Sequence, residues 1–248
     1  MTATLYALPA SHPCAAIDLA LRLKGIEFRR VDMIPVVSKV QMWARFRGVT
    51  VPGIEFADGE RVHGSREIVR TLEHRAPEPP LLPADGHARR LVEEGELWGD
   101  QVLQPLARRI AWASLKRRTG ALMSYGENAD LPVPDAMARL SAPVLAPTAA
   151  WFNGASDGAV RSDLINLDFH LDRADYWIER GAMGGEQPTA ADLQVGAGIA
   201  LLLTFGDIAD RVGAHECARV ARRWFPDYPG RMPAGVLPRA WLEARPPS

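Results

Sequence analysis

Two serines stand at positions where amphipathic helices should begin, and such positions can hold an anion. Ser11 comes just before Pro13 and an apolar helical pattern that extends to residue 23. Ser65 follows Gly64 and precedes apolar residues at helical spacing, Ile68, Val69 and Leu72. A serine hydroxyl and the free amide hydrogens of a helix start favour a carboxylate or a phosphate. The residues alone leave open a simpler interpretation, in which Ser65 only caps its own helix.

The segment before Ser65 has the pattern of a β-hairpin that would position this serine. Pro52 stands at the head of the apolar run 54–56, and proline suits the first residue of a strand because it cannot donate to a sheet ladder. Asp58 and Gly59 give the strongest short hairpin signal, and residues 61–63 form the return strand.

The preceding residues supply two further strands and two helices. Residues 4–8 and 28–33 are typical of strands, residues 11–23 of a helix that ends at Gly25, and residues 38–46 of a weaker helix. The predicted order is β-α-β-α-β-β-α, with a right-handed β-α-β crossover at its start. We therefore expect an α/β domain over residues 1–76.

Beyond a proline-rich segment the pattern changes to helices alone. Residues 77–87 cannot form a helix interior and predict a linker, and residues 88–248 should form an all-α domain. A long helix is expected from about residue 87 to residue 118, with a kink at Pro105. Residues 121–134 have little periodicity and should form a loop.

The next two segments differ in how regular their patterns are. Residues 135–152 should be broken by Pro143 and Pro147. Residues 163–179 predict an amphipathic helix with leucines on its inner face. We interpret three acids on its outer face as solvated rather than as a cation site, namely Asp168, Asp172 and Asp175.

A capping box is expected to begin a buried helix over residues 193–203. The hydroxyl of Thr189 should accept from the amide of Asp192, whose carboxylate should accept from the amide of Thr189 in return. Residues 196–198, Gly-Ala-Gly, lack the third glycine and the preceding strand of a dinucleotide-binding loop, so close helix packing explains them better. The tail, residues 211–246, should hold one more helix.

The composition argues against several classes of function. The chain has 29 basic and 30 acidic residues, and a formal net charge of -1 gives no reason to expect nucleic acid or an anionic membrane as partner. No apolar run is long enough for a membrane span, and the first residues lack a signal-peptide pattern. Cys14 and Cys217 are too few for a disulfide framework or a cysteine-built metal site. We expect a soluble cytoplasmic protein without a metal.

Taken together, these features resemble the cytosolic glutathione transferase family. The resemblance covers nearly the whole chain and is carried, in order, by Ser11-x-Pro13-Cys14, Val51-Pro52, Ser65-Arg66 and Thr189-x-x-Asp192. The serine at position 11 looks most like the theta-type members. The resemblance implies a thioredoxin-like N-terminal domain with a cis proline at position 52, followed by the all-helical domain of the glutathione transferase fold.

The resemblance also implies how the matched residues would bind glutathione. The backbone of Val51 would pair with the cysteinyl backbone, on an edge that the cis Pro52 holds open. Ser65 and its amide would take the γ-glutamyl carboxylate, which favours anion binding over simple capping, and Arg66 would hold part of the same anionic end. The glycyl carboxylate would be reached by residues that follow Val37, either Lys39 or Gln41.

Ser11 would hydrogen-bond the sulfur of glutathione, and elementary chemistry supports that arrangement. A free thiol with a pKa of about 8.5 is only a few per cent thiolate at neutral pH, and the thiolate is the nucleophile. A hydroxyl donor and the start of the helix at Pro13, both facing the sulfur, would lower that pKa. The resemblance thus implies a glutathione S-transferase with glutathione as co-substrate and a small hydrophobic electrophile as second substrate.

The long helix should provide the pocket for that electrophile. One stripe of this helix, next to its buried face, is expected to border the cleft opposite Ser11 and to make it both apolar and basic. Its residues are Gln101, Pro105, Arg108 and Trp112. Transferases of this type are usually dimers, so we also expect a homodimer in which the helix after Ser65 meets the partner's long helix.

Two alternatives stay open from the residues alone. The family usually has an acidic residue or glutamine before the binding serine, facing the γ-glutamyl ammonium, and here that residue is Gly64. This departure favours a non-catalytic glutathione- or ligand-binding protein with the same fold. Residues 11–14 are also a C-x-x-C motif whose first cysteine is replaced, which suggests a glutathione-dependent thiol oxidoreductase or isomerase. Cys14, however, is more typical of a buried helix residue.

Overall fold

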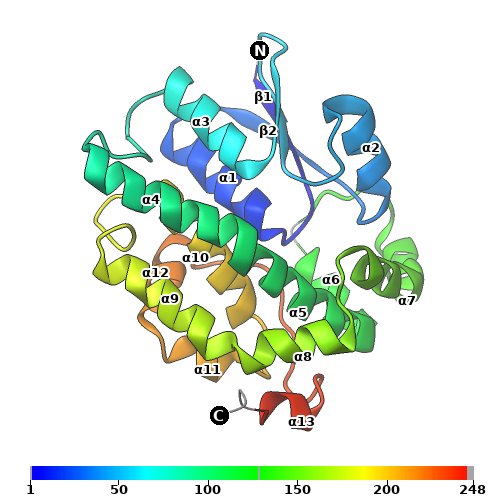
Figure 1. The fold of residues 1–248 in the computed structure, drawn as a ribbon. Helices are drawn as coiled ribbons and strands as arrows, with labels where there is room; N and C mark the ends of the chain where they lie inside the picture. Colours follow the sequence, from blue (N-terminus) through cyan, green and yellow to red (C-terminus); the bar gives the residue numbers. More distant parts are fainter. Residues whose placement is uncertain (1, 128, 245–248) are drawn as a thin grey trace.

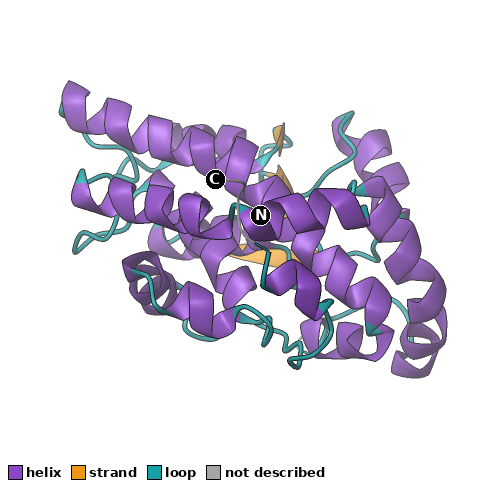
Figure 2. Cartoon of the chain, turned by 60° about the horizontal axis from the view of Figure 1, so that its bottom comes forward, coloured by secondary structure: helices purple, strands orange, loops and turns teal. Residues whose placement is uncertain are grey.

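The computed structural model describes residues 2–127 and 129–244. A small sheet lies at one end of the molecule (Figure 1). The rest is mostly helical (Figure 2). Helices α1 and α3 pack together on one face of this sheet, and α2 lies on the other (Figure 1). The elements are β1 Ala3–Ala7, α1 His12–Leu23, β2 Phe28–Asp32, α2 Val37–Phe46, β3 Gly53–Glu55, β4 Arg61–His63 and α3 Ser65–Arg75.

The strand order is β2-β1-β3-β4, which confirms the predicted β-α-β-α-β-β-α arrangement of a thioredoxin-like domain. Strand β1 runs parallel to β2 and antiparallel to β3, and β3 pairs antiparallel with β4 across the Asp58-Gly59 turn. Alternate residues of β1 point into the core, because successive side chains of a strand face opposite sides of the sheet. Gly25 has a φ of +64°, so it follows α1 in the left-handed conformation expected of it.

The hairpin leads to Ser65 as expected, with one correction. The Val51–Pro52 peptide bond is cis, as the resemblance implied. Gly64, with a φ of +93°, is the N-cap of α3, and Ser65 is the first helical residue. The interpretation of Ser65 as the cap of its own helix is therefore wrong, because the turn needs a backbone conformation that glycine adopts readily.

The long helix continues through Pro105 by a change of helix type. It consists of α4 Gly86–Trp98, a π-helical segment η1 Gly99–Leu103, and α5 Gln104–Arg117. Pro105 has no amide hydrogen for the carbonyl four residues earlier. The amide of Gln104 bonds the carbonyl of Gly99, five residues back, so the turn before Pro105 contains one extra residue.

The segment between residues 77 and 87 is held against the first domain. Lys24 forms an ion pair with Glu73 and donates to the carbonyls of Pro77 and Pro79, at 3.1 and 2.7 Å. Asp85 caps α4. The division into residues 1–76, 77–87 and 88–248 stays a prediction.

Two predicted helix boundaries are wrong. Residues 121–134, expected to be a loop, contain the end of a short 3₁₀ helix, η2 Thr119–Ala121, and α6 Leu122–Tyr125. Helix α7, Asp135–Phe152, continues through both of its prolines. Its buried face consists of alanines packed against α5, and this packing keeps the helix intact: Ala142, Ala146, Ala149 and Ala150.

The predicted helix over residues 163–179 is two helices that meet at Asn166, α8 Asp157–Ile165 and α9 Leu167–Glu179. The helix begins early because the hydroxyl of Ser156 accepts from the amide of Ala159 at 3.2 Å. Among the three acids, Asp168 and Asp172 are exposed. Asp175 is partly buried and accepts from the amide of Cys217, which corrects its predicted solvent-facing role.

Helix α10, Ala190–Leu203, forms the centre of the helical region and packs against α1, α4, α5 and α12. Both hydrogen bonds of the predicted capping box are present. A Cβ atom at Gly196 would come within 3.2 Å of Phe225, and one at Gly198 within 3.1 Å of Leu103, which confirms close packing. Instead of the single helix predicted after α10, three short helices follow, α11 Ala209–Gly213, α12 Glu216–Trp224 and α13 Arg239–Leu242. Over the described residues, no helix has the length and apolar character needed to cross a membrane.

Candidate functional site

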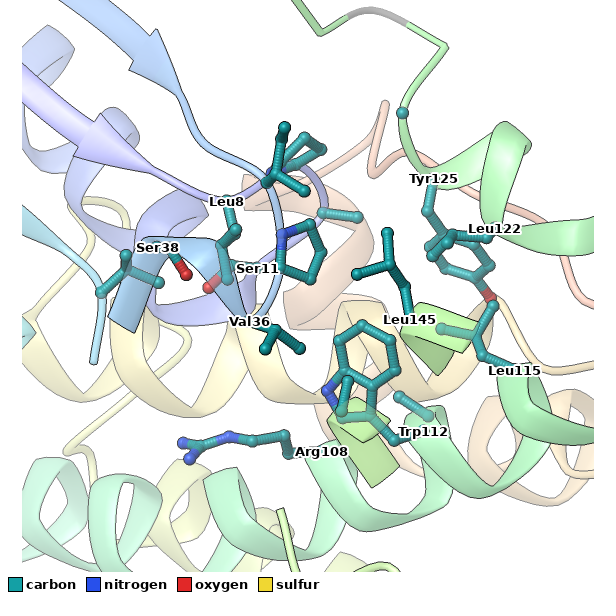
Figure 3. Close-up of a pocket in the computed structure, with 18 of the residues that line it drawn as sticks. Leu8, Ser11, Val36, Ser38, Arg108, Trp112, Leu115, Leu122, Tyr125 and Leu145 are labelled. Carbon is teal, nitrogen blue, oxygen red and sulfur yellow. The ribbon is translucent and has the colours of Figure 1, made fainter. Parts of the chain in front are cut away.

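A cavity of about 900 Å³ lies where the C-terminal end of β1 and the start of α1 face α5, α6 and α7. Ser11, Val51 and Ser65 from the sheet domain line it together with Arg108 and Trp112 from α5. Figure 3 shows Ser11 and Ser38 on one side of this cavity and Arg108 and Trp112 on the other. The two serines and residues of the long helix therefore line the same cavity.

Ser11 is held at the cavity wall by contacts from both ends of the chain. It is the N-cap of α1, but its hydroxyl bonds no amide of that helix. Its own amide donates to the carbonyl of Leu8 at 3.2 Å. The residue before it, Ala10, has a φ of +51°, and the carbonyl of Ala10 accepts a 2.7 Å hydrogen bond from the hydroxyl of Tyr228. The C-terminal segment thus fixes the turn that presents Ser11.

Cys14 is fully buried beneath Ser11, as expected of a structural helix residue. Burial raises the pKa of its thiol, and a hydrogen bond with the side chain of Ser11 offsets part of that effect. A buried thiol whose pKa is raised stays protonated and is a poor nucleophile.

Ser65 and Val51 both offer unused hydrogen-bonding groups to the cavity. The buried Ser65 begins α3, and no hydrogen bond engages its hydroxyl in the part of the chain that the structure describes. Val51 precedes the cis Pro52, and within the same residues its backbone N–H and C=O have no partner. Such an edge can accept an extended peptide.

Three of the predicted site residues lie elsewhere. Gln101 is exposed and does not line the cavity; the extra residue of η1 rotates it away and turns Asp100 inward instead. Arg66 lies near the buried carboxylate of Glu96, with 3.4 Å between Nε and Oε2, and is not part of the lining. Gln41 is exposed beside a separate depression near β2.

The remaining predicted residues lie at or beside the cavity. Lys39 lines it, and its ammonium nitrogen lies 5.2 Å from the ring centroid of Phe152 on α7. Pro105 is also part of the lining. Pro52 is buried behind Val51 and is not part of it.

Asp100 is one of the carboxylates that line the cavity, together with Asp130 and Asp135, and it was not among the predicted site residues. Burial raises the pKa of Asp100, while the charges of Arg66 and Arg108 act in the opposite direction. The side-chain amides of Gln194 and Gln104 donate to it at 3.3 and 3.4 Å. The available signals were the aspartate itself and Pro105, but a proline within a helix does not by itself predict a π-helical turn.

His12 and Arg108 form a second polar pair in the cavity wall. Burial lowers the pKa of His12 well below its ordinary value, and the nearby charge of Arg108 lowers it further. His12 is therefore neutral, and its buried Nε2 has no hydrogen-bond partner within the described chain. His12 was not among the predicted site residues.

The wall next to Lys39 contains a strained turn. Val36 has a φ of +71° and a ψ of -54°, and the amide of Val37 bonds the carbonyl of Pro35 at 2.9 Å, which is a γ-turn. A β-branched residue at positive φ is unusual, and such strain tends to occur at functional sites. The turn places Val36 in the cavity lining (Figure 3).

One group of described residues could hold a metal ion, and it lies far along the chain from this cavity. Asp172, Asp175 and His215 place ligand atoms within 4.8 Å of one another. Asp175 already accepts from Nδ1 of His215 at 2.8 Å and from the amide of Cys217 at 2.7 Å. These bonds tie α9 to the start of α12, so the group has a structural role.

The fold matches that of a class of known proteins. Residues 5–80 match the family model described as "Glutathione S-transferase, N-terminal domain". The chain therefore contains a thioredoxin-like domain of the glutathione S-transferase type, followed by a helical region. No curated protein matches the sequence.

Solved structures show the same fold over nearly the whole chain. A glutathione S-transferase from Rhodospirillum rubrum F11 is 20% identical, covers 98% of this chain and 99% of its own, and has a TM-score of 0.63. A glutathione S-transferase from Methylobacterium radiotolerans JCM 2831, in complex with glutathione sulfonate, is 18% identical over 96% of this chain and 99% of its own, also with a TM-score of 0.63. The β-etherase LigF from Sphingobium sp. strain SYK-6 is 20% identical over 90% and 99%, with a TM-score of 0.53.

Proposed function

We propose that this protein is a glutathione S-transferase of the serine type, in which Ser11 stabilises the thiolate of glutathione for attack on a small hydrophobic electrophile. One observation carries the proposal. Ser11, the free backbone edge of Val51 and the unpartnered hydroxyl of Ser65 line a single cavity with an apolar wall from α5. Neither a capping role nor a core role accounts for all three.

Each part of glutathione would find a group suited to it. The edge at Val51 would pair with the cysteinyl backbone, and the hydroxyl of Ser65 with the start of α3 would take the γ-glutamyl carboxylate. Lys39 would reach the glycyl carboxylate. Arg66 and Gln41 do not line the cavity, so the proposal gives them no role in binding.

Asp100 would supply the carboxylate that position 64 lacks. A glutathione seated at Ser65 places its ammonium group near that serine, and Asp100 lines the same cavity. Burial raises the pKa of Asp100, and a bound ammonium would lower it again by favouring the charged form. The absence of an acid at Gly64 therefore gives less support to a non-catalytic protein than the sequence alone suggested.

The reaction would proceed without a general base. The hydroxyl of Ser11 donates to the sulfur, and the start of α1 adds a partial positive charge, so the bound thiol ionises near neutral pH. The thiolate then attacks the electrophile against the wall formed by Trp112 and its neighbours. A thiol oxidoreductase acting through Cys14 is disfavoured, since that thiol is fully buried and its pKa is raised.

We propose further that the protein acts as a homodimer in the cytoplasm, in which both cysteines, buried as free thiols, remain reduced. A dimer mass in solution at micromolar protein concentration is the expected result, and a monomer would contradict this part of the proposal.

The function is tested by measuring conjugation of glutathione with 1-chloro-2,4-dinitrobenzene. The wild-type protein should turn over, and Ser65→Ala should raise the KM for glutathione about tenfold, the effect of one hydrogen bond to a charged group. Ser162→Ala, on the exposed face of α8, removes the same hydroxyl far from the cavity lining and serves as the control. Retention on immobilised glutathione without turnover would instead identify a binding protein.

A further inference from the structure

Arg108 is a cationic side chain in the cavity wall without an anionic partner. Its Nη2 donates to Oε1 of Gln104 at 2.6 Å, but no carboxylate lies within ion-pair distance of its guanidinium anywhere in the described chain. Burial lowers the pKa of Arg108, and the charge of Asp100 offsets part of that effect. Arginine nevertheless stays charged in proteins, so the cavity wall contains a positive charge without an ion-pair partner among the described residues.

The neighbouring arginine shows what a structural arginine looks like in this helix. Arg109 forms two 2.6 Å hydrogen bonds with the two carboxylate oxygens of Asp163, and this pair ties α5 to α8. A buried or partly buried charge is normally paired in this way. Arg108 differs because its guanidinium faces the cavity rather than another element (Figure 3).

Among the described residues, the groups around Arg108 compensate its charge only in part. His12, packed beside it, is neutral. The charge of Asp100 acts favourably on Arg108, and Gln104 bonds to both side chains, but Asp100 forms no ion pair with Arg108 and glutathione's ammonium is its proposed partner. On the other side of Arg108, Trp112 begins a predominantly apolar wall that continues through Leu115, Leu122 and Leu145 (Figure 3).

We propose that Arg108 binds a carboxylate-type anionic group on the second substrate, whose apolar or aromatic body lies along Trp112. The protein would therefore select electrophiles that combine an apolar ring or chain with a negative charge. This inference rests on the proposed transferase function. The two carboxylates of glutathione already have proposed sites at Ser65 and Lys39, so the anion that Arg108 binds comes from the other substrate.

A matched pair of aromatic chlorides tests this selectivity. In both, the thiolate of glutathione attacks the ring carbon that carries chlorine; the C–S bond forms, the C–Cl bond breaks, and chloride leaves with the bonding electrons. The thiol proton passes to solvent. The neutral probe is 1-chloro-2,4-dinitrobenzene, and the anionic probe is 4-chloro-3,5-dinitrobenzoate, which carries a carboxylate opposite the reacting carbon.

Arg108→Met keeps most of the apolar stem and removes the charge, Arg108→Lys keeps the charge, and Arg161→Met removes a charge from the exposed face of α8. Arg108→Met should raise the KM for the benzoate by about tenfold or more, the loss of a charge-assisted hydrogen bond. The KM for the neutral chloride should change by less than about twofold, within the effect of an uncharged contact. Arg108→Lys should fall between, and Arg161→Met should match the wild type.

Equal changes in the KM values of the two electrophiles in Arg108→Met would overturn the inference. An increase in the KM for glutathione alone would also overturn it, because Arg108 would then bind glutathione. The melting temperature of each variant shows whether it is folded, and Arg108→Lys decides the question if Arg108→Met is not. If the wild-type protein conjugates neither chloride, the transferase proposal fails. Binding of 3,5-dinitrobenzoate and of 1,3-dinitrobenzene, measured by quenching of tryptophan fluorescence, then tests Arg108 alone. The inference requires tighter binding of the benzoate, and that preference must disappear in Arg108→Met.

Discussion

Asp100→Asn should separate the contribution of Asp100 to glutathione binding from its contribution to stability. Asparagine has nearly the same shape and can still accept from Gln194 and Gln104, so the substitution removes the charge and little else. A charge-assisted hydrogen bond is worth about 1.5–3 kcal/mol. Asp100 is only partly buried, and its charge already interacts with two arginines, so we expect the lower end of this energy range. That energy corresponds to about a tenfold loss of affinity for glutathione.

The effect should appear in the KM for glutathione and leave kcat nearly unchanged. The γ-glutamyl ammonium lies away from the reacting sulfur, so it is bound equally in the ground state and the transition state. Glutathione affinity of the wild type should also weaken as the pH falls through the pKa of Asp100, because protonation removes the negative charge. The variant should lack that dependence. Steady-state kinetics at several pH values in the mildly acidic range measure both effects.

Stability should change in the opposite direction. The pKa of Asp100 is raised in the folded protein, so its protonated form is favoured there. Its contribution to stability is full below the unfolded-state pKa and is lost as the pH rises through the folded-state pKa. At neutral pH the ionised carboxylate therefore costs stability, and Asp100→Asn should melt at the same temperature or higher.

Glu94→Gln, which removes an exposed carboxylate from α4, is the control for net charge. An unchanged KM for glutathione in Asp100→Asn would refute the binding role. A lower melting temperature at neutral pH would show instead that the carboxylate has a structural role.

Three further predictions test the residues around the reacting sulfur and the contact between the domains. Ser11→Ala should lower turnover roughly ten- to a hundredfold and shift the pH–rate profile to higher pH, whereas Cys14→Ala should mainly lower the melting temperature. Reaction rates measured against pH for both variants test this assignment, and the reverse pattern would contradict it. Tyr228→Phe removes the hydrogen bond to the carbonyl of Ala10, so it should destabilise the fold by about 1 kcal/mol, measured by urea unfolding. It should also lower kcat, because the turn before Ser11 is disturbed. An unchanged kcat would show that this turn keeps its conformation without the hydrogen bond. Glu96→Gln removes the buried negative charge between two arginines of α3 and should lower the free energy of unfolding by about 1.5–3 kcal/mol, measured with denaturant. A change near zero would mean that these ion pairs do not stabilise the contact between α3 and α4.

The elements that could be predicted from sequence are those whose signals act over a few residues. Asp58-Gly59 can form a tight turn in almost any surroundings, and the hairpin is present. Gly25 ends α1 in a conformation that other residues avoid. Thr189 and Asp192 satisfy each other's amides without help from the rest of the fold. The predicted order of elements in the first domain and the central helix followed from such local signals.

The elements that could not be predicted depend on packing between distant segments. Pro143 and Pro147 argue locally for a broken helix, but the alanine face around and after them packs on α5 and keeps the helix continuous. Val36 adopts a γ-turn that its own side chain disfavours, because the surrounding chain holds it there. Neither result can be obtained from windows of a few residues.

The largest difference at the site came from a shift of one residue in the long helix. An α-helical period through Pro105 places Gln101 on the cavity side. Pro105 lacks an amide hydrogen, and the preceding turn is the π-helical segment η1. Its extra residue turns Asp100 toward the cavity instead of Gln101. Arg108 and Trp112, on the C-terminal side of this segment, lie where the α-helical period placed them.

This shift also accounts for the glycine that departs from the family pattern. Gly64 has a φ of +93° and a ψ of 139°, a conformation that costs an L-residue with a side chain appreciable strain. A Cβ atom there would meet nothing within 4 Å, so the backbone and not crowding disfavours an acidic side chain. The helix wall offers a carboxylate to the same cavity at Asp100, in a π-helical turn whose geometry Pro105 imposes. Position 64 lacks an acid, and Asp100 on the opposite wall is turned inward. Both features are consistent with one proposed requirement, a negative charge that faces the glutathione ammonium near Ser65.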